Sequence, residues 1–144
     1  MPHASIGVDV IAGFSGETDE DFLETYDFIK NLNISYLHVF TFSERSGTEA
    51  AAMAESIPVN IRRERNTRLS NLSLKKKHAF YSRFINQTRR VLVEKSKEKD
   101  LYTGFTDNYI KVKFHSSRNL ENNQVDIRLL DIDADYIMQG KVDQ

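Results

Sequence analysis

The stretch from Gly7 to Phe22, GVDVIAGFSGETDEDF, is the part of the chain that most resembles a reactive site. It contains two closely spaced glycines, Gly13 and Gly16, followed by a cluster of acids. A phosphate loop of the G-x-x-x-x-G-K-[ST] type needs a lysine after its second glycine, but Gly13 and Gly16 are too close together and Glu17 follows. A G-x-G-x-x-G dinucleotide fingerprint would need a glycine in place of Ile11. A G-x-S-x-G nucleophile elbow fails because the second glycine directly follows the serine.

The sequence also gives little support for a metal site or for an acid–base catalytic site. The four histidines, at positions 3, 38, 78 and 115, form no metal-ligand spacing. His38 lies in a strand-like run, where a hydrogen-bonded structural role is favoured, and Asp9 either points into a barrel lumen or faces a partner. The chain has no cysteine, which excludes disulfides and thiolate-held iron–sulfur clusters. We therefore expect no catalytic residue and no metal site in this chain.

Basic residues concentrate in the middle of the chain, although the net charge is only −1. Residues 59–99 contain thirteen bases and three acids, whereas residues 1–58 contain two bases and ten acids. Clustered positive charge attracts polyanions at long range, so the middle segment could bind nucleic acid. The alternative is a solvated helix face that packs against the acidic first segment.

The elements around the glycine-rich stretch form a predicted βαβ unit. Residues 6–12 have the pattern of a buried strand, Thr18 begins an amphipathic helix that ends near residues 31–33, and residues 36–42 form a second strand. Such units belong to parallel sheets covered by helices. Because one unit cannot cover both faces of a parallel sheet, we expect residues 1–58 to be the end of a larger α/β domain and the chain to be part of a longer protein.

The second half of the chain changes from helical to strand-like patterning. Pro58 opens a long basic helix that should reach about Gln87. Five short strand-like runs follow and predict a small antiparallel β-barrel. We therefore expect one domain at residues 1–87 and another at residues 88–144. No run approaches the roughly 18 apolar residues of a membrane span, and no signal peptide is visible, so a cytoplasmic location without a membrane partner is expected.

The motifs, taken in order, resemble the C-terminal part of the radical S-adenosylmethionine tRNA methylthiotransferases. The stretch DVIAGFSGETDEDFLET is similar to that family's D-x-I-x-G-F-P-G-E-T, and HVFTFSERSGTEAAAM is similar to its S-x-R-x-G-T-x-A turn. The rest of the chain is similar to the family's connection from the radical barrel into its TRAM domain, through RRERNTRLSNL, VLVE, GFTDNYIKV and a closing M-x-G. The threonylcarbamoyladenosine subgroup is the most similar, chiefly through YLHVFTFSERSGT. Ser15 and Ser46 stand where the family usually has proline.

The resemblance implies the last strands and helices of a TIM-like radical barrel followed by an RNA-binding TRAM barrel of five strands. The full-length enzyme would 2-methylthiolate N6-threonylcarbamoyladenosine next to the tRNA anticodon, using S-adenosylmethionine and two cysteine-held [4Fe–4S] clusters. This chain cannot bind those clusters through cysteine, so alone it should be inactive. The implied partners are the tRNA anticodon stem-loop and the missing N-terminal half. Self-association with a second copy is expected separately, because an exposed edge strand can pair with another chain.

Site residues follow from the resemblance and from the basic segment. The residues expected to lie against S-adenosylmethionine are Val10, Ile11, Gly13, Phe40 and Phe42. The residues expected to bind RNA are Lys75, Lys76, Lys77, Arg83, Arg89, Arg90, Lys111 and Lys113. For the interleaved aromatics Phe80, Tyr81 and Phe84, core packing is favoured over base stacking. Two alternatives remain open: a stand-alone RNA-binding module, and a metabolic α/β enzyme fragment whose basic helix packs on an acidic neighbour.

Overall fold

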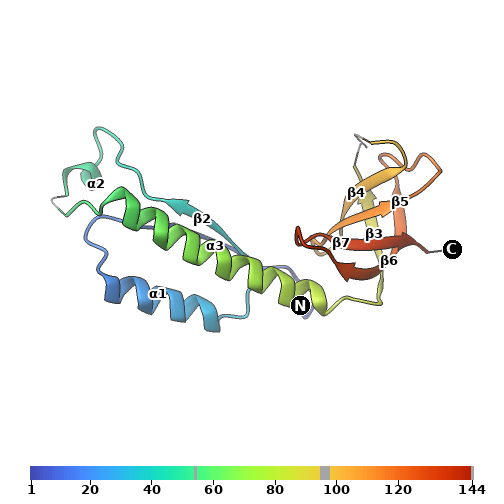
Figure 1. Cartoon of the computed structure of the whole chain (residues 1–144), viewed down its shortest axis with the longest axis horizontal. Coiled ribbons are helices and arrows are strands. Elements are labelled where there is room, and N and C mark those ends of the chain that lie inside the picture. The colour runs from blue at the N-terminus through green and yellow to red at the C-terminus, as the bar shows by residue number, and fades with distance from the viewer. Residues whose placement is uncertain (54, 95–97, 144) are drawn as a thin grey trace. The chain divides into compact units, whose positions relative to one another are not determined.

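The computed structural model describes residues 1–53, 55–94 and 98–143, which form two compact units (Figure 1). One unit is Ile6–Lys76, and the other combines Met1–Ser5 with Lys77–Gln144. The units divide inside the long helix α3 (Val59–Ser82), ahead of the domain boundary predicted near residue 88. The undescribed residues 95–97 lie between two of the predicted strand-like runs, and residue 54 lies shortly before Pro58.

The first unit contains the predicted βαβ arrangement. Strands β1 (Gly7–Ala12) and β2 (Tyr36–Thr41) pair in parallel, and helix α1 (Asp19–Asn31) connects them. The short helix α2 (Glu49–Ala52) precedes α3. Thr18 caps α1 with the full capping box: its hydroxyl accepts a hydrogen bond from the Asp21 backbone, and the Asp21 carboxylate accepts one from the Thr18 backbone. The sequence prediction of this helix start is confirmed.

One face of the two-stranded sheet is covered and the other is open. Leu37 from β2 packs with Phe22 and Ile29 of α1 and with Leu69 and Leu72 of α3 in one buried cluster. In Figure 1, both helices lie along the sheet within this unit. The residues of β1 and β2 that point the other way are exposed. An exposed face on a parallel pair is unusual, because parallel sheets are generally covered on both sides.

The second unit is a closed five-stranded barrel in the order β3-β4-β5-β7-β6. Its strands are β3 (Thr88–Val93), β4 (Leu101–Thr106), β5 (Lys111–His115), β6 (Gln124–Ile132) and β7 (Met138–Val142). The expectation of a purely antiparallel barrel is wrong at one pair, because β5 and β7 run parallel. The reason is topological: strands in a closed ring can alternate in direction throughout only when their number is even. With five strands, one neighbouring pair must be parallel.

The barrel interior is filled by inward-facing side chains of the strands and by aromatic side chains from the end of α3 and the residues after it. Phe80, Tyr81 and Phe84 are buried in the same cluster as the inward side chains of the strands, which confirms core packing for these aromatics. The helix ends at Ser82 and not near Gln87. Asn86 adopts a φ of 67°, and its backbone N–H donates to the carbonyl of Leu129 in β6 at 2.8 Å. Pairing with the barrel therefore ends the helix early.

Among the described residues, no helix combines the length and the apolar character needed to cross a membrane.

Candidate functional site

The buried Arg62 of α3 ties the segment that follows β2 to the residues just before α3. Its guanidinium donates to the carbonyls of Ile57 at 2.6 Å and Phe42 at 3.0 Å, and it forms an ion pair with Glu44. The hydrogen bond from Arg62 is the main reason why the pKa of Glu44 falls to about 2. A Cβ added to Gly13 would lie 2.5 Å from Cγ of Arg62, so the glycine allows the arginine stem to pass.

A second buried arginine of α3 ties the acidic start of α1 to the turn that follows β1. Arg65 donates to the Glu17 carboxylate at 2.5 Å and to the Asp19 carboxylate at 2.7 Å. The Glu17 carboxylate also accepts a hydrogen bond from the backbone N–H of Gly13 at 2.9 Å. These contacts bring part of the predicted basic helix against the acidic first segment, as the packing alternative required. They also show that the acids after the glycine turn have a structural role.

A hollow of about 410 Å³ lies at the carboxyl ends of β1 and β2. Three of the five residues predicted to contact S-adenosylmethionine line it: Ile11, Phe40 and Phe42. Parallel register places Ile11 directly opposite Phe40. The carboxyl ends of parallel strands are the usual place for ligands in α/β folds. The geometry of the hollow is therefore that of a candidate small-molecule site.

The other two predicted contacts lie elsewhere. Val10 faces the covered side of the sheet and packs against the core. Gly13 rests on the Arg62 stem and does not line the hollow. The exposed side of the sheet carries Asp9 opposite His38, whose ring meets Tyr36 edge-on at 5.1 Å between centroids. The His38 side chain is exposed on this side of the sheet.

The adjacent lysines at the end of α3 differ in environment. Lys76 donates to the carbonyls of Lys30 at 3.1 Å and Leu32 at 2.8 Å, so it caps the C-terminus of α1. Burial lowers its pKa. Burial, followed by the positive charge of Lys111, lowers the pKa of Lys77. Lys76 is therefore held inside its unit, whereas Lys77 and Lys111 form a small positive cluster.

The remaining predicted RNA contacts are divided between inward-held and accessible groups. Lys111 and Lys113 occupy alternate outer positions of β5, and Lys75 is exposed on α3. Arg83 is exposed and donates to the carbonyl of Pro2 at 2.8 Å. Within the barrel unit the structure brings Lys77 near Lys111, and Lys113 follows at the next outer position of β5.

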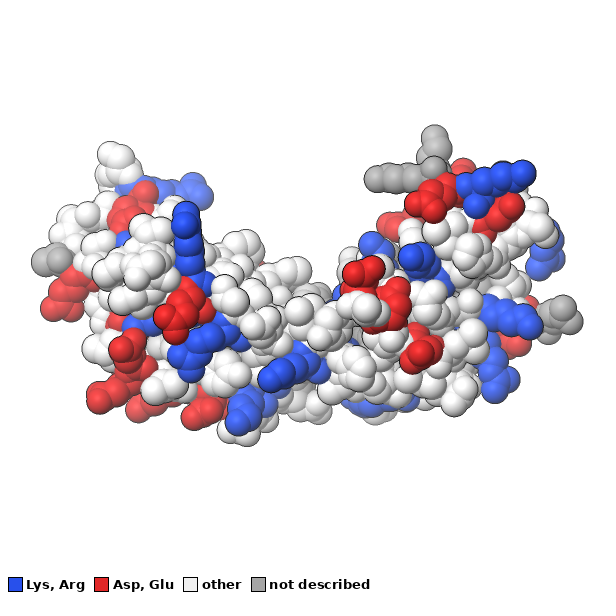
Figure 2. Space-filling model, viewed as in Figure 1, with Lys and Arg blue, Asp and Glu red and all other residues white. Residues whose placement is uncertain are grey.

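The two neighbouring arginines of β3 point in different directions. Arg89 is mostly buried, with its guanidinium over Phe84 and 3.4 Å from Asp107. Arg90 is exposed and pairs with an exposed carboxylate of β6. In Figure 2, acids gather at the lower left, where α1 lies in Figure 1, whereas both signs of charge are interspersed on the barrel. Any RNA contact on the barrel must therefore depend on particular side chains.

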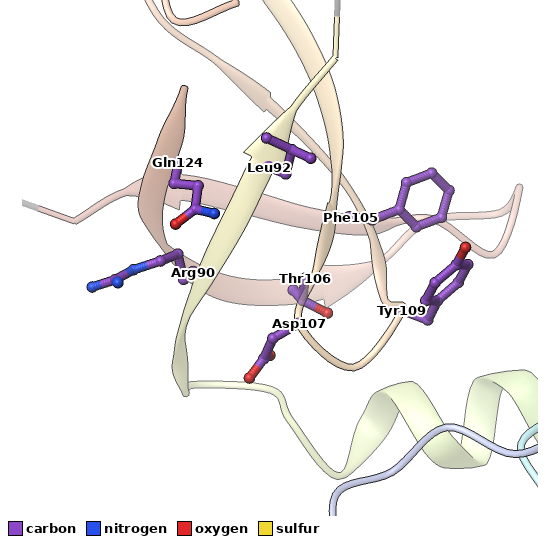
Figure 3. A pocket seen from close by; sticks show the side chains of 7 residues that line it. All are labelled: Arg90, Leu92, Phe105, Thr106, Asp107, Tyr109 and Gln124. Atoms are coloured by element: carbon purple, nitrogen blue, oxygen red, sulfur yellow. The ribbon is translucent and has the colours of Figure 1, made fainter. Parts of the chain in front are cut away.

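Sequence reasoning missed a group of apolar side chains on the barrel surface. Leu92, Phe105 and Tyr109 line a hollow of about 490 Å³, together with polar residues that include Arg90 and Gln124 (Figure 3). Leu92 and Tyr109 are large and exposed. The signal was present in TGFTDNYIKVK, where an aromatic residue occupies a turn rich in polar residues and lysines follow at alternate positions.

No group of three or more metal-ligating side chains occurs among the described residues.

No family model matches the chain. Individual curated proteins do match. Threonylcarbamoyladenosine tRNA methylthiotransferase MtaB of Bacillus subtilis is 37% identical over 90% of this chain and 30% of its own length. The same-named protein of Aquifex aeolicus is 42% identical over 78% of this chain and 26% of its own length.

A tRNA-2-methylthio-N(6)-dimethylallyladenosine synthase of Lachnoclostridium phytofermentans is 35% identical over 96% of this chain and 31% of its own length. The chain belongs to the radical S-adenosylmethionine tRNA methylthiotransferase family. The predicted resemblance is confirmed. The chain spans about 30% of the length of these methylthiotransferases, so it represents one part of the family's architecture.

Proposed function

We propose that this chain is the RNA-contacting C-terminal part of a tRNA methylthiotransferase, with residues 1–87 ending a radical S-adenosylmethionine barrel and residues 88–144 forming a TRAM domain. The single observation that carries the proposal is the 37% identity to a named methylthiotransferase over 90% of the chain. The closed five-stranded barrel after an open parallel sheet supports it, because such a sheet requires further covering elements. Family membership favours this function over a metabolic α/β enzyme fragment.

The proposed substrate of the full-length enzyme is N6-threonylcarbamoyladenosine beside the tRNA anticodon. Relatives named for that nucleoside are 33–42% identical to this chain, and relatives named for dimethylallyladenosine are 29–37% identical. The motif YLHVFTFSERSGT, which spans β2 and the turn that follows it, supports this choice. The proposed location is the cytoplasm, where tRNA is available.

S-adenosylmethionine would bind at the carboxyl ends of β1 and β2. Ile11, Phe40 and Phe42 offer an apolar wall that fits the adenosyl group, and Val10 and Gly13 would contribute through the strand backbone. The bound molecule supplies methyl and radical chemistry in the full-length enzyme. Because this chain has no cysteine, the two [4Fe–4S] clusters would be held by the N-terminal half, and this chain alone would be inactive. The free edges of the β1–β2 pair would join that half or a second copy.

Binding of a tRNA anticodon stem-loop by the chain tests the RNA-contacting role. The double variant Lys111→Glu/Lys113→Glu reverses two charges on the outer face of β5 and should weaken binding severalfold. Arg118→Glu is the matched control, because it reverses an exposed charge on a loop of the same unit outside the proposed surface. Lys76 is a poor choice for this test, since it also caps α1. Undetectable binding at low salt, or a double variant that binds as tightly as the wild type, would overturn the proposal.

A further inference from the structure

Tyr109 is held in solvent by a backbone conformation that its side chain disfavours. It lies in the turn between β4 and β5, with a φ of 66° and a relative exposure of 66%. Positive φ is uncommon for residues with a Cβ and is an outlier for a bulky one, and hairpin turns of this kind usually place glycine or asparagine there. Glycine would therefore be the relaxed residue at this position. Such outliers are a starting point for a functional hypothesis.

Buried polar side chains brace the turn around Tyr109. The Thr106 hydroxyl donates to the Asn108 side-chain oxygen at 2.6 Å and accepts from the backbone N–H of Ile110 at 2.9 Å. The Asn108 side-chain amide donates to the carbonyl of His3 at 3.2 Å. Thr106 and Asn108 are both buried, at 5% and 8% exposure. The turn is therefore ordered by specific hydrogen bonds, and the exposed ring is placed by them.

The ring continues an apolar strip across neighbouring strands. Phe105 and Tyr109 have ring centroids 5.4 Å apart at an interplanar angle of 43°. Leu92 lies opposite Phe105 in the β3–β4 register and is 55% exposed. Figure 3 shows the two rings on one side of the hollow, with Leu92 between them and Gln124. An exposed strip of this kind is suited to a flat apolar ligand.

Cationic side chains flank the strip. The Lys111 ammonium lies 5.9 Å from the Phe105 ring centroid. Arg90 lines the same hollow, and its pairing with Asp126 at 3.3 Å joins two exposed groups, so a phosphate can compete for the guanidinium. Asp107 also lines the hollow, but it pairs with Arg89. A flat apolar surface between two available cations matches the two parts of a nucleotide, the base and the phosphate.

We propose that this hollow binds an unpaired base of single-stranded RNA, which stacks on Tyr109 and Phe105 while Arg90 and Lys111 contact the adjoining phosphates. Stacking on aromatic side chains requires a base whose face is free, so the site discriminates single strands from duplex RNA. The inference rests on the proposed RNA-contacting function and assigns it a ligand class and a place on the barrel.

The test measures binding of two labelled probes to the full chain by fluorescence anisotropy: a single-stranded oligoadenylate and a blunt-ended RNA duplex. Tyr109→Gly removes the ring and relaxes the backbone. It should weaken oligoadenylate binding about fivefold or more, the lower end of the contribution of one stacked base, and leave duplex binding unchanged. Its melting temperature should equal or exceed that of the wild type. Tyr109→Phe should retain oligoadenylate binding, because the ring remains.

Tyr136→Gly is the matched control, since Tyr136 also has a positive φ of 58° in a turn of the barrel but does not line the hollow. It should bind both probes as the wild type does. Oligoadenylate binding that Tyr109→Gly leaves intact would overturn the stacking site while the RNA-binding function stands. A wild-type chain that binds neither probe would overturn both proposals. An effect of Tyr109→Gly on self-association alone would assign the strip to a second copy and also contradict the base site.

Discussion

Gly13 and Arg62 are in direct contact, with the arginine stem occupying the place where a side chain of residue 13 would begin. A Cβ at Gly13 would be 2.5 Å from Cγ and 2.9 Å from Cβ of Arg62. Gly13 also has a φ of 78°, which a residue with a Cβ rarely adopts. The glycine turn that resembles a ligand-binding motif in the sequence is thus required by the packing of α3 beneath it.

Replacement of Gly13 by alanine should lower the free energy of unfolding by about 2–4 kcal/mol, because backbone strain and steric overlap add together. Urea unfolding followed by circular dichroism measures the change. Gly47→Ala is the matched control: its φ is 84°, but no atom lies within 4 Å of the added Cβ. Gly47→Ala should lower the free energy of unfolding by about 1–2 kcal/mol, from backbone strain alone. Equal losses at both positions would contradict the contact with Arg62.

The ion pair between Arg62 and Glu44 should make stability depend on acid pH. The pKa of Glu44 falls from 4.5 to about 2, mainly through the hydrogen bond from Arg62. A carboxyl group with a lowered folded pKa stabilises the protein fully above its unfolded value, and the contribution is lost as pH falls from about 4.5 towards 2. The difference in unfolding free energy between the wild type and Glu44→Gln should therefore shrink over this range. A difference independent of pH would count against the pair.

Two buried serines of the first unit should respond oppositely to alanine. The Ser15 hydroxyl is buried and has no hydrogen-bond partner among the described residues, whereas the Ser35 hydroxyl accepts from the backbone N–H of Ile6 at 3.0 Å. Removal of an unpaired buried hydroxyl recovers its desolvation cost. Ser15→Ala should therefore raise the free energy of unfolding by about 1 kcal/mol, and with it the melting temperature. Ser35→Ala should cost about 1 kcal/mol. Destabilisation by Ser15→Ala would reveal an unrecognised partner of that hydroxyl.

RNA binding by the barrel should weaken as salt rises. Each phosphate contact contributes close to one unit to the slope of log affinity against log salt. The double variant Lys111→Glu/Lys113→Glu should therefore reduce the magnitude of the slope by about two units, and Arg118→Glu should not change it. Titrations of the anticodon stem-loop at several salt concentrations provide the slopes. An unchanged slope in the double variant would remove β5 from the interface.

Anaerobic reconstitution with iron and sulfide should leave the chain without a cluster. The sequence has no cysteine, and thiolates are the ligands that [4Fe–4S] clusters require. Iron analysis and the visible absorption spectrum after desalting report the result. Stoichiometric iron would show that other side chains hold a cluster and would contradict the proposed division of labour between the two halves.

Local pattern was sufficient to determine much of this protein. Thr18 and Asp21 specify a helix start through contacts three residues apart, and the alternation in KVKFH specifies which side chains of β5 face outwards. Family membership was also readable, because long motifs such as DVIAGFSGETDEDFLET carry many residues in a fixed order. These features depend on residues that are near one another in the chain.

Only the tertiary structure decided which charges are available and which side chains meet. Arg62 and Arg65 have the same residue type as Arg90, but they are buried and paired with Glu44 and Glu17, whereas Arg90 is exposed. The parallel pairing of β5 with β7 follows from closure of an odd ring, which no single strand encodes. The exposure of Tyr109 likewise depends on contacts across the β4–β5 hairpin and with the N-terminal segment. Such long-range contacts form only when the chain folds, so local sequence patterns do not contain them.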